Sequence, residues 1–435
     1  MAAAEKPPVT GTGSTALDGL LTWIDQRFPL ISTWKAHLTE YYAPKNFNFW
    51  YYFGSLALLV LAIQIVSGIF LTMNYKPDAN LAFASVEYIM REVPGGWIIR
   101  YMHSTGASAF FICVYLHMFR ALLYGSYRAP RELLWIFGML IYLCLMGEAF
   151  FGYLLPWGQM SYWGAQVIIN LFSAIPLIGP DLSLWIRGDY VISDATLNRF
   201  FALHVIAIPL LLLGLVVAHL LALHEVGSNN PDGIEIAKRK DAKGIPLDGI
   251  PFHPYYTVKD ILGVVVFMLV FVVVVFFAPE MGGYFLEYNN FVPADPLQTP
   301  AHIAPVWYFT PYYSILRAVP PLFNSQFPGV VAMGVSVMIL FLLPWLDRGA
   351  VKSIRYRGIY FKVALTAFVI VFLVLGYLGT EPITVWGQFG GWLGDADRAT
   401  VISRICTVIY FLFFILMPWY TKVDKTKPEP ARVTH

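Results

Sequence analysis

Residues 100–120 read RYMHSTGASAFFICVYLHMFR and hold two histidines, His103 and His117, in a segment apolar enough to cross a bilayer. The two imidazoles are fourteen residues apart, close to four helical turns. They therefore project from nearly the same face, about 21 Å apart along the axis. A second apolar segment repeats the arrangement with His204 and His219. If the two spans run in the same direction, His103 can face His204 near the outer membrane surface. His117 can then face His219 near the inner surface.

Two imidazoles opposed across a helix bundle can supply both axial ligands of six-coordinate haem iron. The two pairs therefore predict two haem sites at two depths. The alternative is that the four histidines cap helices or bond to serines. Two neighbouring spans carry glycine pairs at the same fourteen-residue spacing, which leaves room for a flat macrocycle between close helices. These glycines are Gly54, Gly68, Gly138 and Gly152.

Three polar residues lie near the depths where haem propionates would emerge. They are Gln64, Arg100 and Arg120. Arginine can bind a carboxylate through two parallel hydrogen bonds, so the two arginines are candidate propionate ligands. The alternative is that both snorkel to the membrane interface.

The composition excludes an ordinary soluble protein. Of the 435 residues, 58% are hydrophobic and 13% are charged, whereas charged residues make up about a quarter of a soluble domain. The net charge of +2 gives no indication of nucleic-acid binding. The first 15 residues lack the apolar region of a cleavable signal peptide.

Eight apolar segments predict an all-α, polytopic membrane protein whose first four spans form a di-haem four-helix bundle. Residues 17–40 mix apolar and charged positions and predict an amphipathic surface helix. Residues 158–187 and 302–316 predict short helices between spans. The eight predicted spans are 48–73, 97–123, 132–155, 194–223, 258–278, 326–346, 361–380 and 399–420.

Eight spans place both chain ends on the same side of the membrane. The segments on that side hold 21 of the 29 lysine and arginine residues. The positive-inside rule therefore predicts cytoplasmic termini, in a bacterial inner membrane. The predicted organisation is a cytoplasmic segment 1–47, the di-haem bundle 48–225, a cytoplasmic loop 226–257, a four-span region 258–420 and a cytoplasmic tail 421–435.

Over roughly residues 15–420 the chain resembles the cytochrome b family of ubiquinol–cytochrome c reductase, the respiratory bc complex. The resemblance rests on the four-histidine, four-glycine frame and on GYLLPWGQMSYWGAQVI, HEVGSNNPDG, FHPYYTVKD and PVWYFTPYYSILRAVP. It implies two non-covalent b-type haems. The low-potential haem would be held by His103 and His204 near the outer face, and the high-potential haem by His117 and His219 near the inner face.

The resemblance also implies a Q cycle with ubiquinol and ubiquinone as substrates. Outer-site quinol would give one electron to a Rieske iron–sulfur subunit and one to the low-potential haem. The second electron would reach the inner haem and reduce quinone, with proton uptake from the cytoplasm. A membrane-anchored c-type cytochrome and a homodimeric complex are further implied. The implied outer site comprises Tyr153, Gly164, Pro305, Trp307, Tyr308 and Tyr313, and the inner site His224, Ser228, Asn229, Lys259 and Asp260.

The inner-site residues also suit that role chemically. His224 lies about one turn beyond His219, and Asp260 is an acid at the mouth of the next span. Such a pair can relay protons to a reduced quinone. The alternative is that they are ordinary polar groups of a loop.

The outer motif departs from the family at one position. The family usually carries a glutamate after the proline of this motif, thought to take a proton from quinol, whereas this chain has Val306. We interpret Glu148, one helical turn before Gly152, as the replacement proton acceptor, because an intramembrane carboxylate is costly without a role. The alternative is a hydrogen bond within a helix interface.

The spacing of His204 and His219 is fifteen residues, one more than is usual in the respiratory family. One extra residue rotates the second ligand by about 100°. Pro209 lies between them, and a π-bulge there would absorb the extra residue. The photosynthetic bf complex has the wider spacing too, but its cytochrome is split after the fourth span and binds a third haem through a cysteine. This chain continues and has Tyr51 and Tyr52 in that place.

Two other function classes fit part of the pattern. A secondary transporter could carry protons on the intramembrane histidines and Glu148, and it would hold no chromophore. A di-haem membrane anchor of a dehydrogenase would need only one quinone site.

Overall fold

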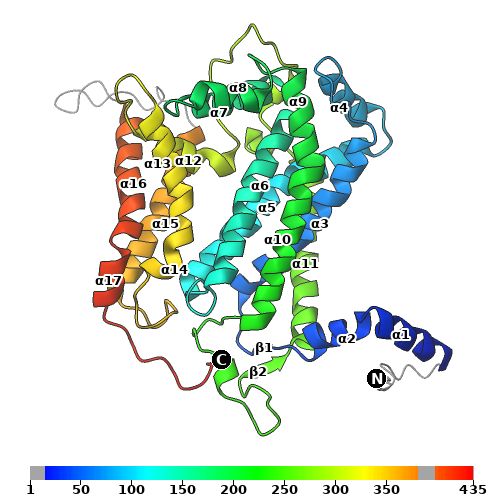
Figure 1. Ribbon diagram of the computed structural model, residues 1–435, viewed down its shortest axis with the longest axis vertical. Helices are drawn as coiled ribbons and strands as arrows, with labels where there is room; N and C mark the ends of the chain where they lie inside the picture. Colours follow the sequence, from blue (N-terminus) through cyan, green and yellow to red (C-terminus); the bar gives the residue numbers. More distant parts are fainter. Residues whose placement is uncertain (1–14, 381–396, 435) are drawn as a thin grey trace.

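The computed structural model describes residues 15–380 and 397–434 and is almost entirely helical (Figure 1). Among these residues, eight helices are long and apolar enough to cross a membrane, which confirms the predicted all-α, polytopic fold. The spans are Phe49–Thr72, Gly96–Tyr124, Glu132–Leu154, Asp194–Val226, Phe252–Phe277, Phe327–Leu346, Ile359–Thr380 and Arg398–Ile415.

The first four spans pack in two pairs. Helix α3 (Tyr52–Thr72) packs along α5 (Gly96–Tyr124), and α6 (Glu132–Leu154) packs along α10 (Ile208–Val226). The fifth span, α11 (Phe252–Phe277), packs against α3 and α5. The remaining spans therefore form a second group, which Figure 1 shows beside the first.

This second group surrounds a short helix that does not span. Helix α12 (Thr310–Ala318) packs against α13 (Phe327–Met338), α15 (Ile359–Thr380) and α16 (Arg398–Ile415). The sixth span continues from α13 into α14 (Leu343–Leu346). Residues 302–316 thus include a short helix between spans, as predicted.

The fourth span is interrupted as the histidine spacing predicts. It begins with α9 (Asp194–Ala202), passes through a π-helical turn η3 (Leu203–Ala207) and continues as α10, with Pro209 in the first turn. A π turn accommodates one additional residue relative to an α-helix. The predicted distortion beside Pro209 is confirmed, and it returns the fifteen-residue spacing to one helix face.

Two span boundaries differ from the prediction by more than three residues. The fifth span begins at Phe252, six residues before the predicted 258, because hydropathy marks where the apolar run starts and not where helical hydrogen bonding starts. The eighth ends at Ile415, and a separate helix α17 (Met417–Val423) follows with Pro418 in its first turn. Proline lacks the N–H that would continue the preceding helix.

Short elements cover the two ends of the bundle (Figure 1). One end, here named the terminal face, carries α1 (Thr15–Arg27), α2 (Leu30–Trp34) and the C-terminal segment to Thr434. Residues 17–40 are thus helical but broken at Pro29. The same face holds an antiparallel ribbon of β1 (Tyr42–Pro44) and β2 (Gly249–Pro251). The other end, named the opposite face, carries α4 (Ala82–Arg91), α7 (Gln159–Ser173) and α8 (Gly179–Arg187).

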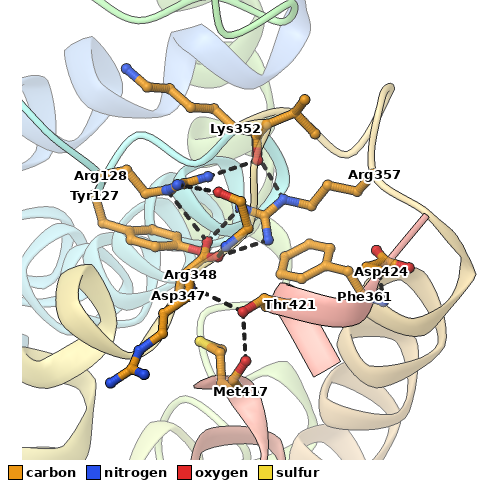
Figure 2. Close-up of polar contacts among 12 residues, drawn as sticks. Tyr127, Arg128, Asp347, Arg348, Lys352, Arg357, Phe361, Met417, Thr421 and Asp424 are labelled. Carbon is orange, nitrogen blue, oxygen red and sulfur yellow. Dashed lines mark hydrogen bonds and ion pairs between the residues drawn. The ribbon is translucent and has the colours of Figure 1, made fainter. Parts of the chain in front are cut away.

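A buried polar network on the terminal face joins the two groups of spans, as Figure 2 shows. Asp347 accepts a 2.6 Å hydrogen bond from the Tyr127 hydroxyl and pairs with the Arg357 guanidinium. Arg128 donates to the carbonyls of Gly349 and Val351, at 2.5 and 2.7 Å. Tyr127 and Arg128 follow α5, whereas the others follow α14. The network therefore fixes one group of spans against the other.

The charge on Asp347 is stabilised by these contacts. Burial alone would raise the pKa of this carboxyl, but the Arg357 guanidinium and the Tyr127 hydroxyl outweigh it, and the pKa is lowered. A carboxyl with a depressed pKa contributes stability at neutral pH. That contribution is lost as the pH falls through the ordinary aspartate range, near 4, towards the depressed folded value.

We expect Asp347→Asn to lower the free energy of unfolding by roughly 3–5 kcal/mol, because it leaves the Arg357 charge buried without its partner. Thermal unfolding of the detergent-solubilised protein between pH 3 and 8 would measure this. Glu40, which is exposed on the terminal face, provides the control Glu40→Gln. An unchanged midpoint in Asp347→Asn, or unchanged acid sensitivity, would contradict the role given to the network.

Candidate functional site

The structure brings the four histidines together in the predicted pairs. The rings of His103 and His204 have centroids 6.1 Å apart, and those of His117 and His219 are 6.4 Å apart. Imidazole nitrogens bind a metal at about 2.0–2.1 Å, so two axial nitrogens lie about 4 Å apart, with each ring centre behind its nitrogen. Both separations suit one metal ion between two imidazoles.

The protein itself offers no fuller metal site in its described part. Among residues 15–380 and 397–434, no group of three or more His, Cys, Asp or Glu side chains could hold a metal ion. A metal between each histidine pair would therefore need its other ligands from a non-protein group. A haem macrocycle provides four such nitrogens in a plane.

Each predicted glycine faces one histidine. A Cβ atom on Gly54 would lie 3.1 Å from His117 Cε1, one on Gly68 3.3 Å from His103 Cε1, and one on Gly138 3.4 Å from His219 Cε1. At Gly152 a Cβ atom would clash with the His204 ring. The glycines on α3 and α6 thus leave the space beside the imidazoles that a flat macrocycle needs.

The Nδ1 atoms of His103 and His204 both lie within hydrogen-bond distance of protein groups. Ser67 Oγ lies 2.9 Å from His103 Nδ1, and His204 Nδ1 lies 2.9 Å from the Glu148 carbonyl oxygen. The Glu148 carboxylate is also 3.0 Å from the same nitrogen. A partner on Nδ1 orients the ring and leaves Nε2 for a metal. Glu148 therefore contacts a candidate ligand, while its role as a proton acceptor stays a prediction.

The three candidate propionate residues lie close to these pairs. Gln64 Oε1 and Arg120 Nε are buried without a hydrogen-bond partner among the described residues. Arg120 also lies 3.1 Å from His117 Nδ1. Arg100 lines a cavity of about 290 Å³ at the opposite face, together with Tyr101. Unpaired buried polar atoms are costly, so these groups fit an additional polar ligand such as a haem carboxylate.

The predicted outer quinol-site residues lie in the half of the bundle that is nearer to the opposite face. The Tyr308 ring stacks on Phe111 at 3.9 Å, and Trp307 Nε1 donates to Ser108 Oγ at 3.1 Å. Both contacts fix the segment that follows Pro305 and the buried Val306 against helix α5. The Arg317 guanidinium lies over the Tyr313 ring. Gly164 lies beside the Tyr153 ring, whose hydroxyl donates to Glu287 at 2.9 Å.

The predicted inner quinone-site residues lie on the terminal face and meet a residue that the sequence did not indicate. The Tyr41 ring packs edge-on against His224, with centroids 4.9 Å apart, and its hydroxyl lies 2.8 Å from Ser228 Oγ. Tyr41 is 187 residues from Ser228 in the chain, so no local motif could have indicated it.

The other three inner-site residues have separate contacts. Asn229 is buried and donates to the Tyr124 carbonyl, so it fixes the loop after α10 against α5. Lys259 lies over the Tyr256 ring, and Asp260 hydrogen-bonds with Ser55 of α3.

Two family models and several known proteins match this chain. Residues 38–227 match the family model described as Cytochrome b/b6/petB, and residues 293–411 match Cytochrome b(C-terminal)/b6/petD. The chain is 64% identical to cytochrome b of Allochromatium vinosum, over 95% of this chain and 98% of the other. It is 48% identical to cytochrome b of Rhodospirillum rubrum, over 95% and 96%.

A solved structure is similar as well. The chain superimposes on a structure titled Hyperthermophilic respiratory Complex III with a TM-score of 0.83 and 40% identity, covering 93% of this chain and 99% of that one.

The glycine geometry generates a test. We expect Gly68→Leu to displace the His103 imidazole and reduce the haem bound per chain from two to one, measured by a haem extraction assay on purified protein. Gly214→Leu is the matched control, because nothing lies within 4 Å of a Cβ atom at that glycine of α10. Two haems retained in Gly68→Leu would contradict the assignment of this level.

Proposed function

This chain belongs to the cytochrome b family of the respiratory bc complex (complex III), and from that premise we propose that it carries electrons across the membrane between two quinone sites. In this proposal quinol is oxidised at the outer site and quinone is reduced at the inner site, as in a Q cycle. The complex as a whole is a quinol–cytochrome c oxidoreductase, and its turnover would contribute to the proton gradient.

The observation that carries the proposal is the pair of opposed imidazoles at each of two depths, 6.1 and 6.4 Å apart between ring centroids. A b-type haem bound at each level would supply a one-electron redox centre. The chain's own contribution is to hold the imidazoles opposed, to leave space beside them with glycine, and to exclude water with apolar helices.

Neighbouring protein groups would orient the histidine ligands. Ser67 and Glu148 hold the Nδ1 atoms of His103 and His204, so both rings stay fixed when an electron arrives. Arg100, Arg120 and Gln64 would bind the haem carboxylates. Glu148 would thus belong to the outer site, where it contacts His204, a proposed haem ligand.

Orientation follows from charge. Eight apolar helices make the chain a multi-pass membrane protein, and its similarity to bacterial proteins supports a place in the inner membrane. We assign the terminal face to the cytoplasm, since it carries most of the lysine and arginine. The organisation would then be a cytoplasmic segment 1–47, the di-haem bundle 48–225, a cytoplasmic loop 226–257, the region 258–420 and a cytoplasmic tail 421–435.

The inner site would lie on this cytoplasmic face. Tyr41 and Ser228 hold each other beside His224, so quinone bound there would meet a hydroxyl and an imidazole. Asp260, in the third turn of α11, can deliver protons from the cytoplasm to reduced quinone. The outer site would be formed by Tyr153, Gly164 and the segment from Pro305 to Tyr313.

Partners follow from the family. A Rieske iron–sulfur subunit and a membrane-anchored c-type cytochrome would accept the high-potential electron, and the complex would be a homodimer. The chain itself offers no ligands for an iron–sulfur cluster, since its three cysteines, Cys113, Cys144 and Cys406, lie within three different spans. No nucleic-acid partner is expected.

The two-site function is tested with Asp260→Asn in the intact complex. We expect quinol to reduce the haems as in the wild type, but reoxidation by added quinone to slow by roughly 100-fold, because proton delivery at the inner site is removed. Stopped-flow absorbance of the haem bands measures both steps, and Glu132→Gln on the same face is the control.

The alternative classes give different results in that experiment. A transporter would show no haem absorbance at all. A one-site dehydrogenase anchor would show haem reduction and reoxidation equally unaffected by Asp260→Asn, which would overturn the inner site.

A further inference from the structure

A carboxylate outside the predicted site contacts one of its residues. Glu287 lies in the loop between α11 and α12, immediately before the short helix η6 (Tyr288–Phe291). The Tyr153 hydroxyl donates a 2.9 Å hydrogen bond to Glu287 Oε2, and Asn290 Nδ2 donates to the same oxygen at 3.3 Å. Two neutral donors from different elements therefore orient this carboxylate.

The loop that carries Glu287 is fixed to the start of α7. Asn290 Oδ1 accepts a 2.8 Å hydrogen bond from the Ser161 backbone N–H. Backbone hydrogen bonds join Gln159 to Val292 and Ala294 to Trp157, at 2.9 and 3.0 Å. The carboxylate is consequently held against the end of α6 and is not carried on a free loop.

Both outer-site motifs are adjacent to this carboxylate. Tyr153, its hydrogen-bond partner, belongs to the stretch that includes Gly164. On the other side, Phe285 stacks on Trp307 with centroids 6.4 Å apart. Tyr308 is also close, because burial and then the negative charge of Glu287 raise the pKa of the Tyr308 hydroxyl. Glu287 thus lies between the two segments that would bind quinol.

The surroundings of Glu287 suit reversible protonation. The titratable groups that face it are Tyr153 from α6 and Tyr308 from η7 (Trp307–Phe309), and neither is charged at neutral pH. Within the described residues, no lysine or arginine forms an ion pair with it. Burial raises the pKa of Glu287 to about 7, although its own backbone N–H, Tyr153 and Asn290 act in the opposite direction. A base is most effective when its pKa is near the operating pH.

We propose that Glu287 accepts a proton from quinol at the outer site, the role for which Val306 has no ionisable group. The inference rests on the proposed function. Glu148 is a weaker candidate, because its carboxylate and its carbonyl oxygen both contact His204 Nδ1. In this proposal Glu148 positions the histidine.

Quinol loses two protons and two electrons and becomes quinone. One quinol O–H bond breaks and an O–H bond forms on the Glu287 carboxylate, which becomes a carboxylic acid, while the other proton goes to water at the outer face. One electron would go to the Rieske iron–sulfur centre of the partner and the other to a haem held between His103 and His204.

The first experiment replaces Glu287 with Gln in the intact complex and measures quinol–cytochrome c turnover from pH 5.5 to 9. Wild-type turnover should rise as the pH increases through about 7, because the acceptor must be deprotonated. Glu287→Gln should lose roughly 100-fold and the pH-dependent rise with it. Glu287→Asp should recover part of the rate, and Glu280→Gln, in the same loop, is the matched control.

A second readout does not depend on turnover. Infrared spectra recorded against pH should contain a carboxylic-acid band that titrates near pH 7 in the wild type and in Glu148→Gln but is absent from Glu287→Gln. Tyr153→Phe should move that midpoint to higher pH, because the lost hydrogen bond favoured the charged form. This readout decides the matter even if Glu287→Gln binds less haem.

Three outcomes would overturn the inference. They are wild-type turnover and pH profile in Glu287→Gln, a titrating band that persists in that variant, and a pH-dependent rise that is lost in Glu148→Gln but kept in Glu287→Gln. Failure of the proposed function would look different, since the wild-type complex would then oxidise no quinol at any pH.

Discussion

The arrangement of this protein depends on one constraint, which is that four imidazoles must stay opposed in two pairs inside an apolar bundle. The hydrocarbon core of a bilayer offers no water to satisfy polar groups, so the ring positions have to be set by helix packing and by protein partners. Parallel helices α5 and α10 supply the pairs, at centroid separations of 6.1 and 6.4 Å. Helices α3 and α6 supply the facing glycines.

The π-helical turn at Leu203–Ala207 is a consequence of the same constraint. A fifteen-residue separation on an uninterrupted α-helix would turn one histidine of the fourth span away from its partner. The extra residue is absorbed in the turn that itself contains His204, next to Pro209, where the helical hydrogen-bond pattern is already incomplete. The local irregularity therefore keeps the ligand geometry regular.

Polar side chains at both ends of the bundle fix the loops to the spans. On the terminal face, Asp347 and Arg357 join the loop after α14 to Tyr127, and Glu235 pairs with Arg131 and Lys352. On the opposite face, the segment after α11 is bonded to the start of α7. These contacts fix loops that are far apart in the chain against the first four spans.

The sequence by itself determined the features that arise from local periodicity. Apolar runs of about 20 residues predicted eight spans, and fourteen- and fifteen-residue spacings predicted the histidine and glycine frame and the distortion beside Pro209. The sequence did not predict the helix starts at Phe252 and Met417, because hydropathy does not report hydrogen bonding. Only the tertiary structure decided the contacts of Tyr41 with Ser228 and of Tyr153 with Glu287, which join residues 187 and 134 positions apart. The physical reason is that such contacts depend on how loops close over the bundle, and no periodicity along the chain encodes that closure.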